Sequence, residues 1–280
     1  ISKKKCWEVV DRPSHKPVVS SCWAFRIKRL PDGLLKKLNK ARFCARGFDQ
    51  TEGVDYFETF APVVSWTTVR FMLMMSILLE LQTKQVDYVS AFVQSDIDTE
   101  VYVEMPRGFS QPGKVLKLNK SLYGLKQSPR NHFKNLSSKL KALGFKSSDS
   151  DPCLFVSDKV ICLVYVDDTL FFAPDTKDID DVIKGLERLG MDLEEEDDIA
   201  GFLSVLIERR ADGTIKLTQK GLITRILDAL NIDHLPPKRT PTKLGVLGSD
   251  KEGEPPDGTF SYASVVGMMQ YLQANSRPDI

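Results

Sequence analysis

Two apolar runs joined by a short polar step stand out in the middle of the chain. The runs cover residues 160–164 and 169–173, and the step between them, residues 165–168, reads Tyr-Val-Asp-Asp. Short β-rich runs separated by a polar pair predict a tight hairpin whose turn carries the two aspartates. Adjacent, partly desolvated carboxylates tend to hold a proton unless a cation keeps both ionised, and Mg²⁺ prefers such oxygen ligands.

An aspartate pair alone has a simpler explanation, because Asp is common in turns, where its side chain bonds to the nearby backbone. A third aspartate changes the balance. Asp87 is the single charged residue of a strand-like segment, residues 85–92, and a charge inside a strand needs a partner. The pattern therefore favours a site in which Asp87, Asp167 and Asp168 hold a divalent cation.

A second hairpin is predicted near the N-terminus. Trp23, Phe25 and Ile27 alternate with Arg26 and Lys28, which is the period-two pattern of a strand with one apolar face. Residues 30–33 supply a turn, and the returning segment 37–48 alternates again. One face of the returning strand carries Lys40, Arg42, Cys44 and Arg46. Because arginine offers a planar fork of donors to phosphate oxygens, this hairpin is predicted to clamp a triphosphate.

The rest of the pattern predicts helices separated by short strands. A helix capped by Ser65 or Thr67 runs to about Leu81 and is predicted to be buried, since its apolar stretch is too short to cross a bilayer. Another begins at Pro129 and ends at Gly144. A further helix is expected at 179–189, where it would pack on the back of the sheet, and others at 219–230 and 261–275. Strands are expected at 115–118, 202–208 and 214–217, and a linker at 235–258.

Composition bounds the class of protein. With 280 residues, of which 28% are charged and 42% hydrophobic, the chain resembles an ordinary soluble globular protein of one large or two small domains. Residues 1–48 carry thirteen basic side chains against three acidic ones, which suits a surface that meets phosphates. Residues 175–200 carry eleven acidic side chains against three basic ones. Within them the acidic run 194–198 is predicted to be a solvated loop and not a metal site.

Several chemistries are disfavoured. The five cysteines form no Cys-x-x-Cys pair and are odd in number, which fits a reduced, intracellular setting. The histidines, His15, His132 and His234, lack zinc-site spacing and are assigned surface or packing roles. No apolar stretch is long enough to span a membrane, so no membrane partner is expected. The first residue is Ile1 and not methionine, which suggests a fragment of a longer protein.

The two aspartate segments resemble the catalytic motifs of reverse transcriptases. From about Trp7 to the C-terminus the chain resembles the Ty1/copia class of long-terminal-repeat retrotransposons. Besides the aspartates, the resemblance rests on residues 40–42, 45–48, 55–64, 101–106, 121–130 and 277–280. It implies an RNA-directed DNA polymerase cut from a Pol polyprotein.

The resemblance also implies a fold. We expect an α+β, right-hand polymerase fold in which an antiparallel palm sheet is backed by helices and joined to a fingers β-hairpin and a partial thumb. Residues 1–64 are expected to form an N-terminal arm and the fingers hairpin, and residues 65–200 the palm, of which 100–135 contribute to the fingers. Residues 201–234 are expected to form a primer-grip hairpin and the start of the thumb. Residues 235–280 would be a linker and a helix leading toward an absent ribonuclease H region.

A two-metal nucleotidyl transfer follows from the family pattern, with two Mg²⁺ ions or Mn²⁺ in their place. Asp87 and Asp167 would bridge both ions, Asp168 would assist at the hydroxyl-side ion, and the backbone carbonyl of Tyr88 would complete the nucleotide-side ion. The implied nucleotide contacts are Lys40, Arg42, Arg46, Ser90, Ala91, Phe92 and Tyr123.

Phe92 would lie under the sugar and exclude a 2′-hydroxyl by steric clash. The alternative for Phe92 is a core aromatic, and for Tyr123 an aromatic that packs a loop on the sheet. The implied primer and template contacts are Tyr165, Val166, Phe202, Leu203 and Ser204. Apolar packing is the alternative for Val166, and Ser204 stands where the family usually has glycine.

The implied partners are an RNA template, a DNA or tRNA primer, deoxynucleotides, and the integrase and ribonuclease H segments of the polyprotein. The implied location is the cytoplasm, within virus-like particles. Two other functions stay open. One is an inactive or domesticated nucleic-acid-binding remnant, and the other is an unrelated two-metal nuclease, which would not explain the basic hairpin, Phe92 and residues 122–129 together.

Overall fold

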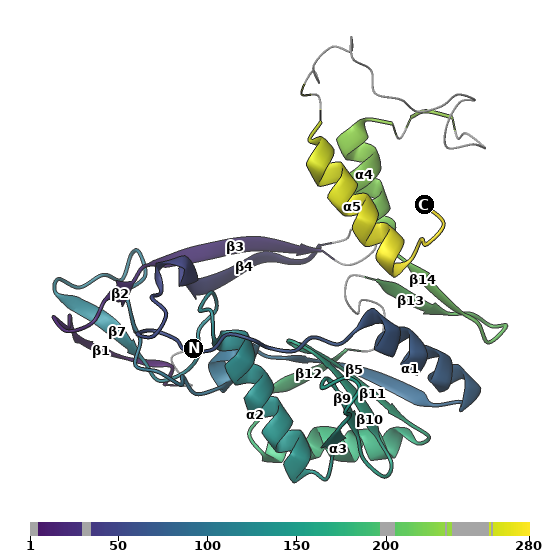
Figure 1. The fold of residues 1–280 in the computed structure, drawn as a ribbon, viewed down its shortest axis with the longest axis horizontal. Helices are drawn as coiled ribbons and strands as arrows, with labels where there is room; N and C mark the ends of the chain where they lie inside the picture. Colours follow the sequence, from purple (N-terminus) through teal and green to yellow (C-terminus); the bar gives the residue numbers. More distant parts are fainter. Residues whose placement is uncertain (1–4, 30–34, 197–204, 233, 237–257, 259) are drawn as a thin grey trace.

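The computed structural model of the chain describes residues 5–29, 35–196, 205–232, 234–236, 258 and 260–280 (Figure 1). They form a mixed α/β fold with several sheets and five α-helices. Among these residues no helix is both long and apolar enough to cross a membrane. All five cysteines are free thiols.

The central element is a six-stranded antiparallel sheet with strand order β12-β5-β11-β10-β9-β8. Its strands are β5 (Gln82–Tyr88), β8 (Lys146–Ser147), β9 (Leu154–Val156), β10 (Ile161–Tyr165), β11 (Asp168–Ala173) and β12 (Leu193–Glu196). The predicted hairpin is confirmed as β10 and β11. These strands read as unbroken apolar runs because both faces of the sheet are covered.

Helices cover the two faces. On one face lie α2 (Ser128–Ala142) and α3 (Thr176–Arg188), whose buried side chains pack against alternate residues of β10 and β11, such as Val164 and Phe171. On the other face α1 (Trp66–Leu78) packs against Leu163 and Leu170. Figure 1 shows α2 and α3 on the opposite side of the sheet from α1. The prediction that the helix around 179–189 packs on the sheet is confirmed.

The prediction that α1 is a buried helix is wrong for one of its faces. Its buried residues face the sheet, but Phe71, Met74 and Leu78 are 54%, 59% and 71% exposed. The helix is apolar all round, so its pattern could not reveal which face would be covered. Its start is as expected, because the Ser65 hydroxyl accepts a hydrogen bond from the N–H of Thr68.

Two further sheets lie at one end of the molecule. A four-stranded sheet of order β1-β7-β6-β2 contains β1 (Trp7–Asp11), β2 (Val18–Val19), β6 (Tyr102–Val103) and β7 (Lys114–Leu118). The long hairpin of β3 (Ser21–Arg29) and β4 (Leu35–Ala45) extends from it over the six-stranded sheet (Figure 1). Its predicted turn at 30–33 lies outside the described residues. Strand 115–118 and the basic hairpin were both predicted from the sequence.

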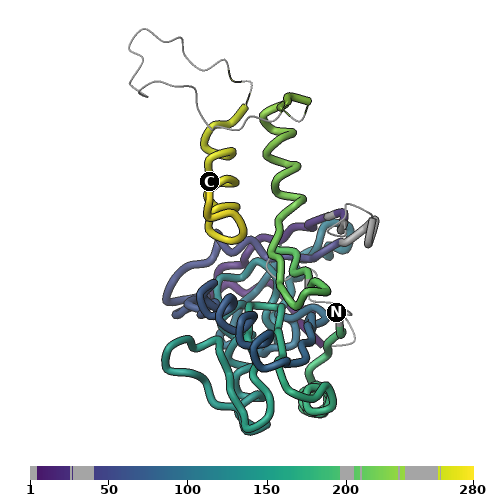
Figure 2. Tube along the Cα trace, turned by 90° about the vertical axis from the view of Figure 1, so that its right-hand side faces the viewer, coloured from purple at the N-terminus to yellow at the C-terminus, as the bar shows by residue number. Residues whose placement is uncertain are grey.

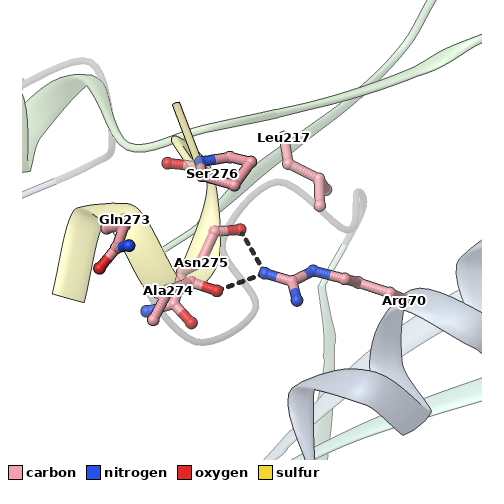
Figure 3. A pocket seen from close by; sticks show the side chains of 7 residues that line it. Arg70, Leu217, Gln273, Ala274, Asn275 and Ser276 are labelled. Carbon is pink, nitrogen blue, oxygen red and sulfur yellow. Dashed lines mark hydrogen bonds between the residues drawn. The ribbon is translucent and has the colours of Figure 1, made fainter. Parts of the chain in front are cut away.

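The C-terminal part contains a small hairpin and two helices. These are β13 (Leu206–Arg209), β14 (Ile215–Thr218), α4 (Lys220–Leu230) and α5 (Tyr262–Asn275). Helices α4 and α5 run side by side and stand away from the sheet (Figure 2). The Arg70 guanidinium of α1 donates hydrogen bonds to the carbonyls of Ala274 and Asn275 at the end of α5 (Figure 3). A cation at a helix C-terminus is favourable, so this contact fastens α5 to α1.

A pocket lies beside this contact, and none of its lining residues is a predicted site residue (Figure 3). It is lined by Arg70, Leu217, Gln273, Ala274, Asn275, Ser276 and Pro278.

The acidic run provides a second correction. Residues 194–196 are not a solvated loop but part of β12, which pairs with β5 at the edge of the sheet. Lys84 of β5 helps to hold β12 at this edge, because its ammonium donates hydrogen bonds to Asp180 of α3 and, at 2.8 Å, to Glu195 of β12. These two hydrogen bonds raise the pKa of Lys84. The rest of the run, 197 and 198, lies outside the described residues.

Candidate active site

A row of acidic side chains crosses the sheet at one end of β5 and β11. Asp168, the first residue of β11, lies directly opposite Asp87 of β5. Directly opposed residues of an antiparallel pair have Cβ atoms about 4.5–5.5 Å apart on the same face. Asp167 occupies the two-residue turn before β11, so only one of the adjacent aspartates belongs to the turn. The register thus brings Asp87 and Asp168 together from two distant segments, with Asp167 next to them in the chain, and all three residues are partly exposed.

The turn that carries Asp167 has a strained backbone. Val166 has a φ of +48°, in the left-handed region that a β-branched residue rarely adopts. The N–H of Tyr88 donates to the carbonyl of Asp167 at 3.3 Å, which ties the turn to β5. Such strain, on the order of 1–3 kcal/mol, persists only where the surroundings impose it, and it concentrates at functional sites.

Basic and aromatic side chains converge beside this row. The guanidinium of Arg42 on β4 lies 5.0 Å from the centre of the Tyr123 ring, and that ring lies 4.9 Å from the ring of Phe92. Burial raises the pKa of Tyr123, Arg42 opposes the rise, and Asp167 and Asp87 add to it. The charges of both aspartates therefore reach the Tyr123 phenol, so the predicted nucleotide contacts and the acidic row share one place.

A tight seam between two backbone segments fixes Tyr123 there. The N–H of Ala45 donates to the carbonyl of Tyr123 at 2.8 Å. Gly124 has a φ of +90°, and a Cβ on it would lie 2.0 Å from the carbonyl oxygen of Ala45. A Cβ on Gly47 would lie 2.2 Å from the carbonyl oxygen of Gly124. Only glycine permits this approach, which joins the strand of Arg42 to the segment of Tyr123.

The other predicted nucleotide contacts surround this centre. Ser90 is exposed, with a φ of +55°, and begins the short 3₁₀ helix η3 (Ala91–Gln94), in which Ala91 is buried. Arg46 is exposed and lies just past the end of β4, where its N–H donates to the carbonyl of Ser20. Lys40 belongs to β4.

The predicted primer contacts are described only in part. Tyr165 ends β10 opposite Asp168. Burial raises the pKa of Tyr271 on α5, and Tyr165 contributes to that rise, so α5 lies near this end of the hairpin. Phe202, Leu203 and Ser204 lie outside the described residues.

Comparison with known proteins decides the family. Residues 4–244 match the family described as reverse transcriptase (RNA-dependent DNA polymerase). The chain belongs to the reverse transcriptase family. The resemblance drawn from the motifs is thereby confirmed.

The relatives of this reverse transcriptase chain are retrotransposon polyproteins. It is 33% identical, over its whole length, to the retrovirus-related Pol polyprotein from transposon TNT 1-94 of Nicotiana tabacum. It is 35% identical over 98% of its length to the Pol polyprotein from transposon RE1 of Arabidopsis thaliana. It is 28% identical over 99% of its length to the Ty1-ER2 Gag-Pol polyprotein of Saccharomyces cerevisiae. The chain spans 22%, 19% and 17% of these relatives.

The donor set of the acidic row suits a hard divalent cation, because opposed carboxylates supply the oxygen ligands that Mg²⁺ prefers. Within the part of the chain that is described, no group of three or more His, Cys, Asp or Glu side chains is arranged to hold a metal ion. These two findings are compatible, since Mg²⁺ commonly binds through one or two carboxylates and completes its shell with water and substrate phosphates.

Sequence reasoning missed two residues near the site. Glu194 of β12 lies directly opposite Asp87, on the other side from Asp168, so a third strand extends the acidic row. His132 of α2, assigned only a surface or packing role, is completely buried behind Phe92 and Tyr88. A period-two reading of residues 193–196 could have suggested the strand, but nothing in the local pattern places His132.

Proposed function

We propose that this chain is an RNA-directed DNA polymerase of a copia-type Pol polyprotein, with a right-hand arrangement of palm, fingers and thumb. In it the six-stranded sheet serves as the palm, the β3–β4 hairpin as part of the fingers, and α4 with α5 as the start of a thumb. The reaction is in-line attack of a primer 3′-hydroxyl on the α-phosphorus of a deoxynucleotide, forming the new O–P bond and releasing pyrophosphate.

The observation that carries the proposal is the register that sets Asp168 opposite Asp87, with Asp167 in the adjoining turn. These carboxylates and the carbonyl of Tyr88 would hold Mg²⁺ ions, which when bound lower the pKa of the hydroxyl and neutralise charge on the leaving group. The hydrogen bond from the Tyr88 N–H to the Asp167 carbonyl ties this turn to β5.

Arg42 and Phe92 give the nucleotide its orientation in this proposal. The Arg42 guanidinium lies over the Tyr123 ring, and its planar fork of donors would meet the triphosphate. Phe92 projects from the turn after β5 and would lie under the sugar, where it leaves no room for a 2′-hydroxyl. Exposed Ser90 begins the same turn, so backbone N–H groups there would meet phosphate oxygens.

Primer extension tests the proposal. The purified chain is given a DNA primer on an RNA template, deoxynucleotides and Mg²⁺ or Mn²⁺, beside the double variant Asp167→Asn, Asp168→Asn. A matched control, Asp149→Asn, Asp158→Asn, removes the same charge from exposed positions elsewhere. We expect extension by the wild type and the control and none by the Asp167, Asp168 variant.

Equal extension by both double variants would refute the proposed metal site. A wild-type chain that fails to extend, yet binds the primed template with an affinity that falls steeply with salt, would favour the binding-remnant alternative.

A further inference from the structure

His132 lies behind the proposed nucleotide site and has no part in the chemistry above. Its side chain, on α2, is completely buried, and neither ring nitrogen makes a hydrogen bond of normal geometry. Burial lowers its pKa to about 4, and the nearby backbones of Ala91 and Val166 and the charge of Asp167 only partly oppose this. The ring is therefore neutral near pH 7. A fully buried imidazole that has only weak contacts with the backbones of Ala91 and Val166 is unusual in proteins, so its position needs an explanation.

The aromatic neighbours of His132 supply one. Its ring meets the Phe92 ring edge to face, with centroids 6.1 Å apart and an interplanar angle of 79°. It meets the Tyr88 ring at 5.4 Å and 66°. Phe92 is partly exposed, whereas His132 and Tyr88 are buried. Since Phe92 also contacts Tyr123, its ring is held between Tyr123 and the buried ring of His132.

Tyr88 and its partner keep the support rigid. The Tyr88 hydroxyl and the Thr169 hydroxyl are 3.2 Å apart and share a hydrogen bond, and both residues are buried in the sheet. His132 therefore rests on the sheet on one side and touches Phe92 on the other. If the ring were removed, a space would open behind Phe92, into which that side chain could withdraw by a change of rotamer.

We propose that His132 is a positioning residue for the nucleotide sugar, because its ring supports Phe92 from the buried side and so sets the room left for a 2′-hydroxyl. The inference rests on the proposed polymerase function. His132 is too deeply buried to touch the nucleotide and acts through Phe92. The neutral ring suits this role, because an aromatic contact does not require a charge.

The test compares two ring variants, His132→Ala and His132→Phe. The readout is the ratio of kcat/KM for a deoxynucleotide to kcat/KM for the matching ribonucleotide on one primed template. We expect His132→Ala to lower this ratio roughly ten-fold, as is usual when a small group is removed from a discriminating pocket. His132→Phe keeps a ring behind Phe92 and should stay within about two-fold of the wild type by the same criterion.

A double variant separates positioning from general damage. In a Phe92→Val background, His132→Ala should change the ratio by less than about two-fold, because residues that act through one another are not additive. Leu136→Ala, one turn further along α2 in the core behind the sheet, is the matched control. It should reduce activity toward both nucleotides equally. If His132→Ala does not fold, His132→Val removes less volume, still leaves a space behind Phe92 and should lower the ratio in the same direction.

Two results would overturn the inference while leaving the polymerase intact. One is an active His132→Ala or His132→Val variant with the wild-type ratio. The other is a drop in the ratio as large in the Phe92→Val background as in the wild type. A wild-type chain that extends no primer would instead overturn the proposed function and this inference with it.

Discussion

Replacement of Gly124 by alanine should open the seam that holds Tyr123 beside Arg42. The new Cβ would lie 2.0 Å from the carbonyl oxygen of Ala45, whereas real Cβ contacts are essentially never shorter than 3.0 Å. The backbones must therefore separate by about 1 Å, which would stretch the hydrogen bond from Ala45 to Tyr123 beyond the usual limit for such bonds.

The cost can be assembled from its parts. Placing a Cβ at a φ of +90° costs about 1–2 kcal/mol, the forced separation about 1–3 kcal/mol, and the lost hydrogen bond about 1 kcal/mol. We therefore expect Gly124→Ala to lower the free energy of unfolding by about 3–5 kcal/mol, allowing for overlap between these terms. Because Tyr123 would move away from Arg42, the KM for deoxynucleotides should also rise.

Gly144→Ala is the matched control. Gly144 has the same φ of +90°, but nothing lies within 4 Å of a Cβ built there. It therefore carries only the conformational cost, about 1–2 kcal/mol. Urea unfolding followed by tryptophan fluorescence gives the free energies, and primer extension gives KM. If Gly124→Ala were no less stable than Gly144→Ala and had a normal KM, the reasoning about the seam would be refuted.

Two further predictions follow from the acidic row and from His132. Glu194 adds a negative charge next to Asp87, so Glu194→Gln should raise the Mg²⁺ concentration for half-maximal extension roughly two- to five-fold. Glu195→Gln, whose side chain instead meets Lys84, should leave that concentration unchanged, and an equal effect of both variants would contradict the prediction. The pKa of His132 is lower in the folded chain than in the unfolded chain, so as the pH falls the unfolded chain takes up this proton first. The free energy of unfolding should therefore fall as the pH drops from about 6.5 toward 4, by up to about 3 kcal/mol. Between pH 7.5 and pH 5, urea unfolding should show a smaller loss of unfolding free energy for His132→Phe than for the wild type. An identical loss in the two proteins would refute the assignment of this pH dependence to His132.

Local patterns were enough to predict many elements, because their causes lie within a few residues. The hydroxyl of Ser65 caps α1 through the N–H of Thr68, and Pro129 lies in the first turn of α2. The apolar runs on either side of residues 165–168 form the β10–β11 hairpin. Such features depend on short-range hydrogen bonds and backbone preferences, which a single sequence displays directly.

Long-range pairing could not be read in the same way. The acidic run around Glu194 has the composition of a solvated segment, yet it forms the edge strand beside β5. Only the completed sheet offers that edge, and the ion pair between Lys84 and Glu195 forms only after the two segments meet. The exposed face of α1 has the same origin, since an apolar helix does not specify which of its faces the sheet will cover.

The sequence by itself determined the family, the choice of the three aspartates as candidate site residues and the basic hairpin, because these depend on residue type and on spacing within short segments. Only the tertiary structure decided that Asp168 faces Asp87, that Gly124 lets Tyr123 approach Ala45, and that His132 lies under Phe92. These contacts join segments far apart in the chain, and they are fixed by sheet register and close packing, which arise only when the whole core assembles.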